Sequence, residues 1–138
     1  CSDEILCRRI FEQVSDDVKK RTYLIGEVWT APEIKAAAAL LDSAITGRMH
    51  FAIACLGSGT PVASFEYQDK FSGLYELLGL PELCVPGSKS SDAETIAGLV
   101  ENMLLRIDAL KGHVGTRLPE IQRLSLRNVR VLLGESLE

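Results

Sequence analysis

One stretch of the chain, residues 40–70, changes its hydrophobic spacing twice and so limits the folds open to the whole sequence. The apolar run at 40–45 suits a buried parallel strand. From Met49 the apolar residues follow helical spacing until a glycine-rich turn at 57–61, and residues 62–67 have the composition of a second strand. The stretch therefore predicts one strand–helix–strand unit with parallel strands.

Periodicity and capping signals predict the other elements. Pro32 lies in the first turn of the helix expected at 30–41, and Gly79 follows the helix expected at 71–78. Gly112, Gly115 and Pro119 are expected to weaken or kink the chain between the last two helices. Because strands alternate with helices, we expect an α/β fold: a Rossmann-like, three-layer parallel sheet covered on both faces. The expected helices are 3–18, 30–41, 49–56, 71–78, 91–110 and 118–132, and the expected strands are 22–25, 43–46, 62–67 and 83–85.

Length and charge narrow the class of protein. A chain of 138 residues suits one domain, 1–138, with a sizeable core. The net charge of −4 gives no reason to expect nucleic acid as a partner, and no apolar run approaches the roughly 20 residues of a membrane span. The four cysteines, Cys1, Cys7, Cys55 and Cys84, lack metal-ligand spacing with histidine, which favours a reducing cytoplasm and predicts no metal.

Three polar side chains are predicted to meet at the carboxyl edge of the sheet. Arg48 and His50 follow the first strand of the central unit, and Lys70 follows the next strand. Ligands of open α/β sheets bind at that edge, and the helix that begins near Met49 presents unpaired N–H groups there. Each side chain alone is more often a solvated cation or a polar helix cap. Together they favour a site for a small, multiply charged anion.

The ordered set of these motifs resembles the C-terminal half of polysaccharide pyruvyl transferases. The pattern is Arg48-Met49-His50 after an apolar strand, then Gly59-Thr60-Pro61-Val62, then Lys70, and the likeness spans residues 22–80. The resemblance implies a two-lobed GT-B-like architecture in which this chain is the C-terminal lobe, including C-terminal helices within 91–135. A strand is expected before Cys1, because a βα unit normally opens with a strand, so we expect a fragment of a longer protein.

The resemblance also implies a reaction and roles for the residues. Such enzymes transfer pyruvate from phosphoenolpyruvate to two sugar hydroxyls of a cell-surface polysaccharide, leaving a ketal. Arg48 and Lys70 would bind the phosphate and carboxylate of the donor, and His50 would transfer a proton. The expected substrate-binding residues are Gly47, Met49, Glu66 and Tyr67. No cofactor is implied, and the expected partners are phosphoenolpyruvate, a sugar acceptor and the missing N-terminal lobe.

Two other functions fit the same residues. A GT-B-type glycosyltransferase lobe would bind the diphosphate of a nucleotide-sugar with the same cations, and Glu66 would then hold the ribose. A non-catalytic domain would keep the anion site without chemistry. The fragment is expected to be inactive alone, because the acceptor should bind between two lobes.

Overall fold

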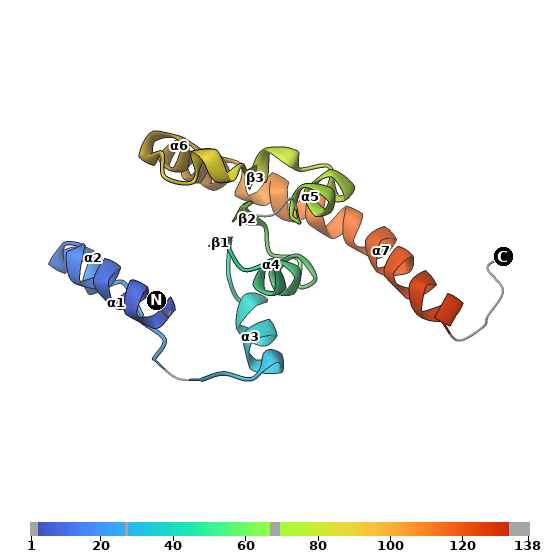
Figure 1. The fold of residues 1–138 in the computed structure, drawn as a ribbon, viewed down its shortest axis with the longest axis horizontal. Coiled ribbons are helices and arrows are strands. Elements are labelled where there is room, and N and C mark those ends of the chain that lie inside the picture. The colour runs from blue at the N-terminus through green and yellow to red at the C-terminus, as the bar shows by residue number, and fades with distance from the viewer. Residues whose placement is uncertain (1–2, 27, 67–69, 133–138) are drawn as a thin grey trace. The chain divides into compact units, whose positions relative to one another are not determined.

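The structure, a computed structural model, describes residues 3–26, 28–66 and 70–132, with side chains up to residue 127 (Figure 1). The chain divides into two compact units, Cys1–Thr30 and Ala31–Glu138, and we describe each by itself. The single lobe expected over 1–138 therefore stays a prediction.

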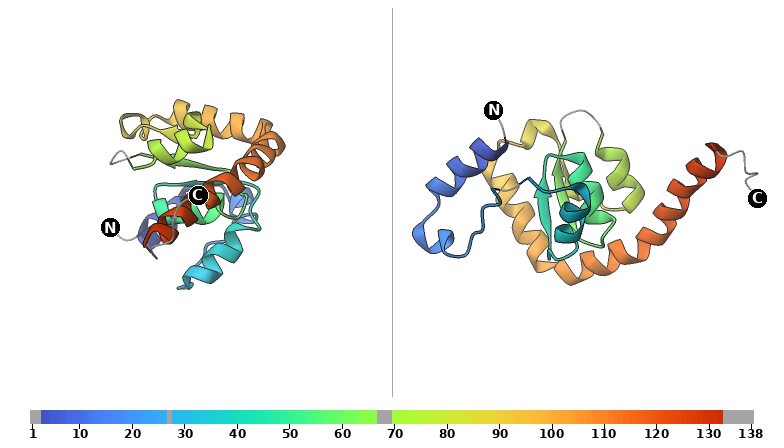
Figure 2. Two further views of the ribbon diagram at one scale, coloured as in Figure 1. Left: turned by 90° about the vertical axis from the view of Figure 1, so that its right-hand side faces the viewer. Right: turned by 90° about the horizontal axis from the view of Figure 1, so that it is seen from below.

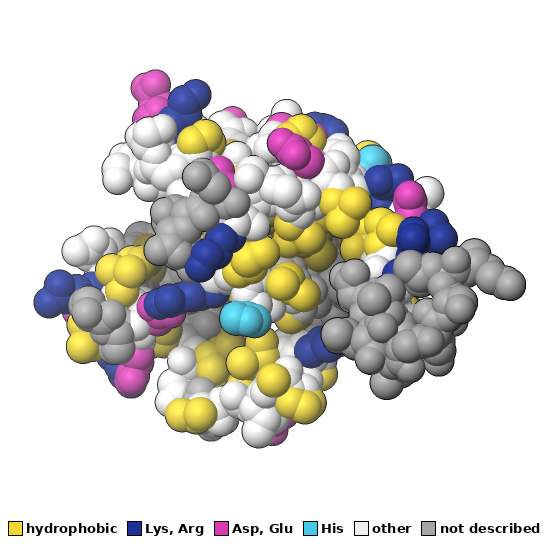
Figure 3. Space-filling model, turned by 45° about the vertical axis from the view of Figure 1, so that its right-hand side comes forward, with side chains coloured by type: hydrophobic (Ala, Val, Ile, Leu, Met, Phe, Trp, Pro, Cys, Tyr) yellow, Lys and Arg dark blue, Asp and Glu magenta, His cyan; other side chains and the backbone are white. Residues whose placement is uncertain are grey.

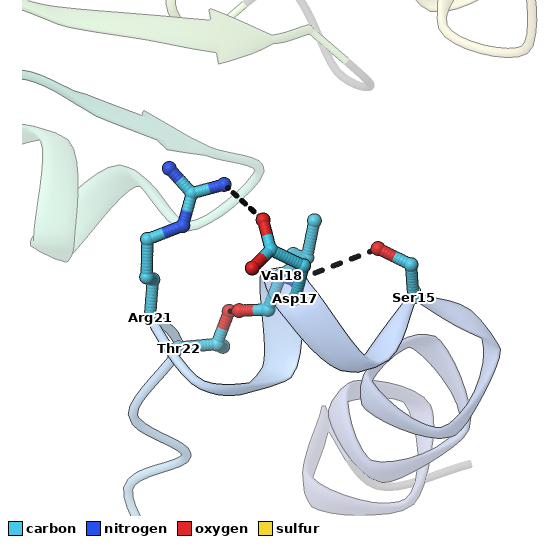
Figure 4. A network of polar contacts seen from close by, with 5 residues as sticks. All are labelled: Ser15, Asp17, Val18, Arg21 and Thr22. Atoms are coloured by element: carbon cyan, nitrogen blue, oxygen red, sulfur yellow. Dashed lines mark hydrogen bonds and ion pairs between the residues drawn. The ribbon is translucent and has the colours of Figure 1, made fainter.

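The first unit holds two helices where one was expected. Helix α1 spans Asp3–Gln13 and α2 spans Asp16–Lys19. The expected helix 3–18 is wrong because Ser15 has extended backbone angles and its side chain accepts a hydrogen bond from the N–H of Val18, at 3.4 Å (Figure 4). Ser15 therefore starts a new helix. The described residues of α1 include no buried side chain, so its apolar face stays exposed within this unit.

The strand expected at residues 22–25 is also wrong, because these residues form no strand in the structure. The N–H of Thr22 donates to the carbonyl of Lys19 at 3.1 Å, and its hydroxyl donates to the carbonyl of Val18 at 2.7 Å. Thr22 therefore completes the turn that ends α2, where Arg21 also pairs with Asp17 (Figure 4). An apolar run without a neighbouring strand has no ladder to join.

The second unit contains a small parallel sheet in the order β1-β2-β3. Strand β1 spans Ala44–Thr46, β2 spans Val62–Phe65 and β3 spans Cys84–Val85. These confirm the strands expected near 43–46, 62–67 and 83–85, although each is shorter. Tyr67 lies outside the described residues.

The prediction that the apolar run before β1 belongs to a buried strand is wrong for its first two residues. Leu40 and Leu41 fell in both the expected strand run 40–45 and the expected helix 30–41, and their side chains are 87% and 42% exposed. Their amide groups donate to the carbonyls of Ala37 and Ala38, at 3.0 and 3.3 Å, so they complete the last turn after helix α3 (Ala31–Ala38) and are not part of the strand. Exposed hydrophobic side chains of the described chain are yellow in Figure 3.

Helices lie on both sides of the sheet, so the α/β class with a parallel sheet is confirmed. In the right-hand view of Figure 2, α4 and α5 lie on one side of the strands and α6 on the other. The α-helices of this unit are α3 (Ala31–Ala38), α4 (Met49–Leu56), α5 (Ser72–Leu78), α6 (Ala93–Leu105) and α7 (Ile107–Leu132), and the 3₁₀ helices are η1 (Pro81–Leu83) and η2 (Gly87–Lys89).

The C-terminal helices divide at a different residue from the one expected. Helix α6 ends at Arg106, whose N–H is shared between the carbonyls of Asn102 and Met103. Helix α7 then continues through Pro119, so the expected division into helices 91–110 and 118–132 is wrong. The weakening or kink expected at Gly112, Gly115 and Pro119 stays a prediction. Leu110 and Val114 are 1% and 0% exposed, and their burial holds the first turns of α7 in a helix.

A buried hydroxyl network joins α5 to the central strand. The Tyr75 side chain is fully buried, and its hydroxyl donates to the carbonyl of Val62 at 2.8 Å. The Ser64 hydroxyl lies 2.7 Å from the Tyr75 oxygen and donates to it, because the tyrosine proton is already used. Burial raises the pKa of Tyr75. Every polar atom in this part of the core therefore has a partner.

The four last carbonyls of α5, 75–78, all accept hydrogen bonds. The first two accept from the backbone of Leu80 and of Gly79, which adopts the left-handed conformation with φ of 73°. The last two accept from α7: Arg117 donates to Leu77 at 2.7 Å, and Nε2 of His113 donates to Leu78 at 2.8 Å. Helix α7 is thus joined to the end of α5 by polar as well as apolar contacts.

A surface ion pair connects α7 to the turn before β1 and gives a pH-dependent prediction. Lys111 Nζ lies 2.6 Å from Asp42 Oδ1, and the hydrogen bond and charge of Lys111 lower the pKa of Asp42. A depressed carboxyl pKa contributes stability that is present above the unfolded value, about 3.9, and is lost as pH falls through the folded value. Urea unfolding should therefore show a small difference between the wild type and Lys111→Met at neutral pH that disappears near pH 2. A difference that grows on acidification would contradict this.

Candidate functional site

The parallel register brings the carboxyl ends of the three strands to one edge of the sheet. Thr46 pairs with Ser64, and Phe65 pairs with Val85. The segments that follow β1 and β2 lead into α4 and α5, so both start from this edge. Arg48 and His50 lie in the first connection and its helix, and Lys70 lies in the second. The structure thus places the three predicted residues in neighbouring connections at the same edge.

The connection after β1 presents its polar groups outward. Arg48 is the N-cap of α4, with extended backbone angles, and its N–H donates to the Thr46 hydroxyl at 2.9 Å. Its side chain makes no capping hydrogen bond, so the N–H groups of the first turn of α4 face the edge without a side-chain cap. The Arg48 and His50 side chains are both exposed. Arg48, His50 and the N-terminus of α4 therefore lie within one helical turn of each other.

Two other predicted substrate-binding residues flank Arg48. The backbone of Gly47 is not in the left-handed region, and a Cβ added there would meet no atom within 4 Å. Glycine is therefore not required by the backbone at this position. The Met49 side chain is half-buried and packs against the hydrophobic core, so it anchors the start of α4. Direct contact of either residue with a ligand stays a prediction.

Glu66 has a role in the structure that its spacing in the sequence did not indicate. Its backbone N–H donates to the carbonyl of Val85 at 2.8 Å, and its Oε1 accepts from the N–H of Ser72 at 3.0 Å. The carboxylate thus caps the N-terminus of α5 and closes the loop that carries Lys70. A carboxylate six residues before a helix start is not a recognised capping pattern, so only the folded loop reveals this contact.

The second connection ends in an exposed cation. Lys70 lies directly before Phe71, the N-cap of α5, and its side chain is exposed. Phe71 is 1% exposed and fixes the chain beside Lys70 in the core. Tyr67, also a predicted substrate-binding residue, lies outside the described residues.

The electrostatic character of the edge suits a small anion. Two cations and the N-terminus of α4 contribute positive charge, and one oxygen of Glu66 is already hydrogen-bonded to Ser72. In the described ranges, no group of three or more His, Cys, Asp or Glu side chains is placed to hold a metal ion. The arrangement is able to bind phosphate or carboxylate groups beside an imidazole.

In the part that the structure describes, no helix has the length and apolar character needed to cross a membrane. Comparison with models of protein families, with curated proteins and with solved structures finds no match. The functional assignment therefore depends on the residues at this edge of the sheet.

Proposed function

We propose that this chain is the donor-binding, C-terminal lobe of a polysaccharide pyruvyl transferase, with a Rossmann-like sheet of the GT-B type. One observation carries the proposal: Arg48, His50 and Lys70 lie in the two connections that leave the same edge of a parallel sheet. This order of residues is the one that resembles the family. The complete enzyme would also need the N-terminal lobe and a sugar acceptor.

The chemistry of phosphoenolpyruvate matches the groups at this edge. The donor carries a phosphate and a carboxylate, close to three negative charges. The guanidinium of Arg48 is able to bind either group through two parallel hydrogen bonds, and Lys70 acts as a point charge on the other. The N-terminus of α4 adds about 0.3–1 kcal/mol at an exposed site at low ionic strength.

His50 is proposed to move the protons of the reaction. Two sugar oxygens bond to C2 of the enolpyruvyl group, the bond from C2 to the phosphate oxygen breaks, and the methylene carbon gains a proton to become a methyl group. The two hydroxyl protons therefore end on the methyl carbon and on the leaving phosphate. The imidazole of His50 is able to accept a proton on one ring nitrogen and to return it, so it is suited to carry one of these protons.

The glycosyltransferase alternative would use the same cations, and the ordered set of motifs favours pyruvyl transfer over it. Glu66 does not separate the two functions, because both expect it to contact substrate and one of its carboxylate oxygens caps α5. The three described cysteines are free thiols, in keeping with the proposal that the reaction takes place in the cytoplasm.

Calorimetric titration of the chain separates these functions. We expect weak, saturable binding of phosphoenolpyruvate and no turnover, because the donor groups are present without the second lobe. Inorganic phosphate serves as the control for charge alone and should bind more weakly, since it lacks the carboxylate. Binding of UDP-glucose without binding of phosphoenolpyruvate would move the assignment to a glycosyltransferase. A folded chain that binds neither would refute the anion site.

A further inference from the structure

An open pocket lies between the edge strand β3 and helix α6. Its volume is ≈ 500 Å³, within the range of small-molecule sites. It is lined by η1, β3, Pro86 and the end of η2, and by residues of α6 and its C-cap that share one helical face. Arg48, His50 and Lys70 are not among its lining residues. The pocket is thus a second place where this chain is able to hold a ligand.

One wall of the pocket is a connected row of three planar polar side chains. Arg106 Nη1 donates to Asn102 Oδ1 at 3.2 Å and lies 3.5 Å from Glu82 Oε1. The side chains of Arg106 and Glu82 are 47% and 45% exposed. Their mutual contacts fix their orientation, and their exposure leaves further hydrogen-bonding positions open. The wall therefore presents the acceptor oxygens of Glu82, the donor groups of Arg106 and the side-chain amide of Asn102, which both donates and accepts.

The charges of the pocket do not favour an anion. Arg106 is paired with Glu82, so the guanidinium is already neutralised. The hydrogen bond from Thr95 lowers the pKa of Asp92 most, and the charge of Lys89, the other cation of the lining, lowers it further. A phosphate at Arg106 would have to compete with the carboxylate of Glu82.

The strand edge in the pocket does not favour an added peptide strand either. The N–H of Cys84 donates to the carbonyl of Pro81, and Pro86 has no N–H. A peptide that extended the sheet at β3 would meet neither donor. Burial, with a smaller effect from Glu66, raises the pKa of the Cys84 thiol to about 11, so the thiol is neutral near physiological pH.

We infer that this pocket binds a neutral saccharide. A sugar hydroxyl donates one hydrogen bond and accepts others, and the row Glu82, Arg106 and Asn102 offers partners for both. Pro86, which is exposed, and Leu99, which is half-buried, supply apolar surface for the C–H face of a sugar ring. The inference stands on the pocket and does not depend on the proposed pyruvyl transfer.

An NMR titration of the ¹⁵N-labelled chain with methyl glycosides of glucose, galactose and mannose tests the inference. At least one glycoside should shift the amide signals of Leu83, Leu99 and Asn102 in a saturable way. Asn102→Leu should raise its Kd by about tenfold or more, because one hydrogen-bonding partner is lost. Glu101→Leu, an exposed neighbour on α6 outside the lining, is the matched control and should leave the Kd unchanged.

Three results would overturn the inference. They are no shift with any of the glycosides, equal effects of Asn102→Leu and Glu101→Leu, and shifts of these amides by inorganic phosphate alone. A parallel titration with phosphoenolpyruvate, followed at the amides of Arg48 and His50, tests the proposed donor site separately. Failure of one proposal is therefore distinguishable from failure of the other.

Discussion

Arg48→Met is expected to lower the affinity of the chain for phosphoenolpyruvate by about 10- to 100-fold, the largest effect of any single substitution at the proposed site. Methionine keeps the length and apolar stem of the side chain but removes the guanidinium. The loss is that of hydrogen bonds to a charged group, which are stronger than those between neutral groups. Isothermal titration calorimetry at low ionic strength measures the change, because salt screens an exposed site.

Two variants separate a specific role of Arg48 from a general effect of charge. Arg123→Met removes the same charge from an exposed position on α7 and should change the affinity little. Arg48→Lys keeps the charge but not the planar fork, so it should recover only part of the binding. Equal losses in Arg48→Met and Arg123→Met would mean that phosphoenolpyruvate responds only to net charge, and the proposed site would be wrong.

Tyr75→Phe is expected to lower the free energy of unfolding by about 1–3 kcal/mol. The substitution removes a hydroxyl that is fully buried and bonded to both Val62 and Ser64. It leaves a buried carbonyl and a buried hydroxyl with one partner fewer, and their desolvation is no longer offset. Urea unfolding followed by circular dichroism measures the change.

The matched control is Tyr23→Phe, because Tyr23 is 80% exposed and its hydroxyl remains in water. That variant should stay within about 0.5 kcal/mol of the wild type. A double-mutant cycle with Ser64→Ala should show coupling between the two hydroxyls. If Tyr75→Phe is no more destabilising than Tyr23→Phe, the buried network contributes nothing to stability.

Local patterns in the sequence were sufficient to predict the central strand–helix–strand unit. They were also sufficient to place Arg48, His50 and Lys70 in the connections at one edge of the sheet. The change from strand to helical spacing near Met49, and Gly79 after α5, depend on residues close in the chain. Strands β1 and β2 were therefore predictable, and with a parallel sheet their connections had to leave one edge. The same local signals failed at residues 22–25, where an apolar run has the composition of a strand but the chain ends a helix instead.

Only the tertiary structure decided the contacts between residues whose spacing along the chain follows no local pattern. The Glu66 carboxylate reaches Ser72, the Tyr75 hydroxyl reaches β2, and Arg106 joins Glu82 in one wall of the pocket beside α6. Hydrophobic spacing records which face of an element is buried, because burial repeats with the period of the element. It does not record which polar groups meet, because a hydrogen bond depends on where separate elements come together in space.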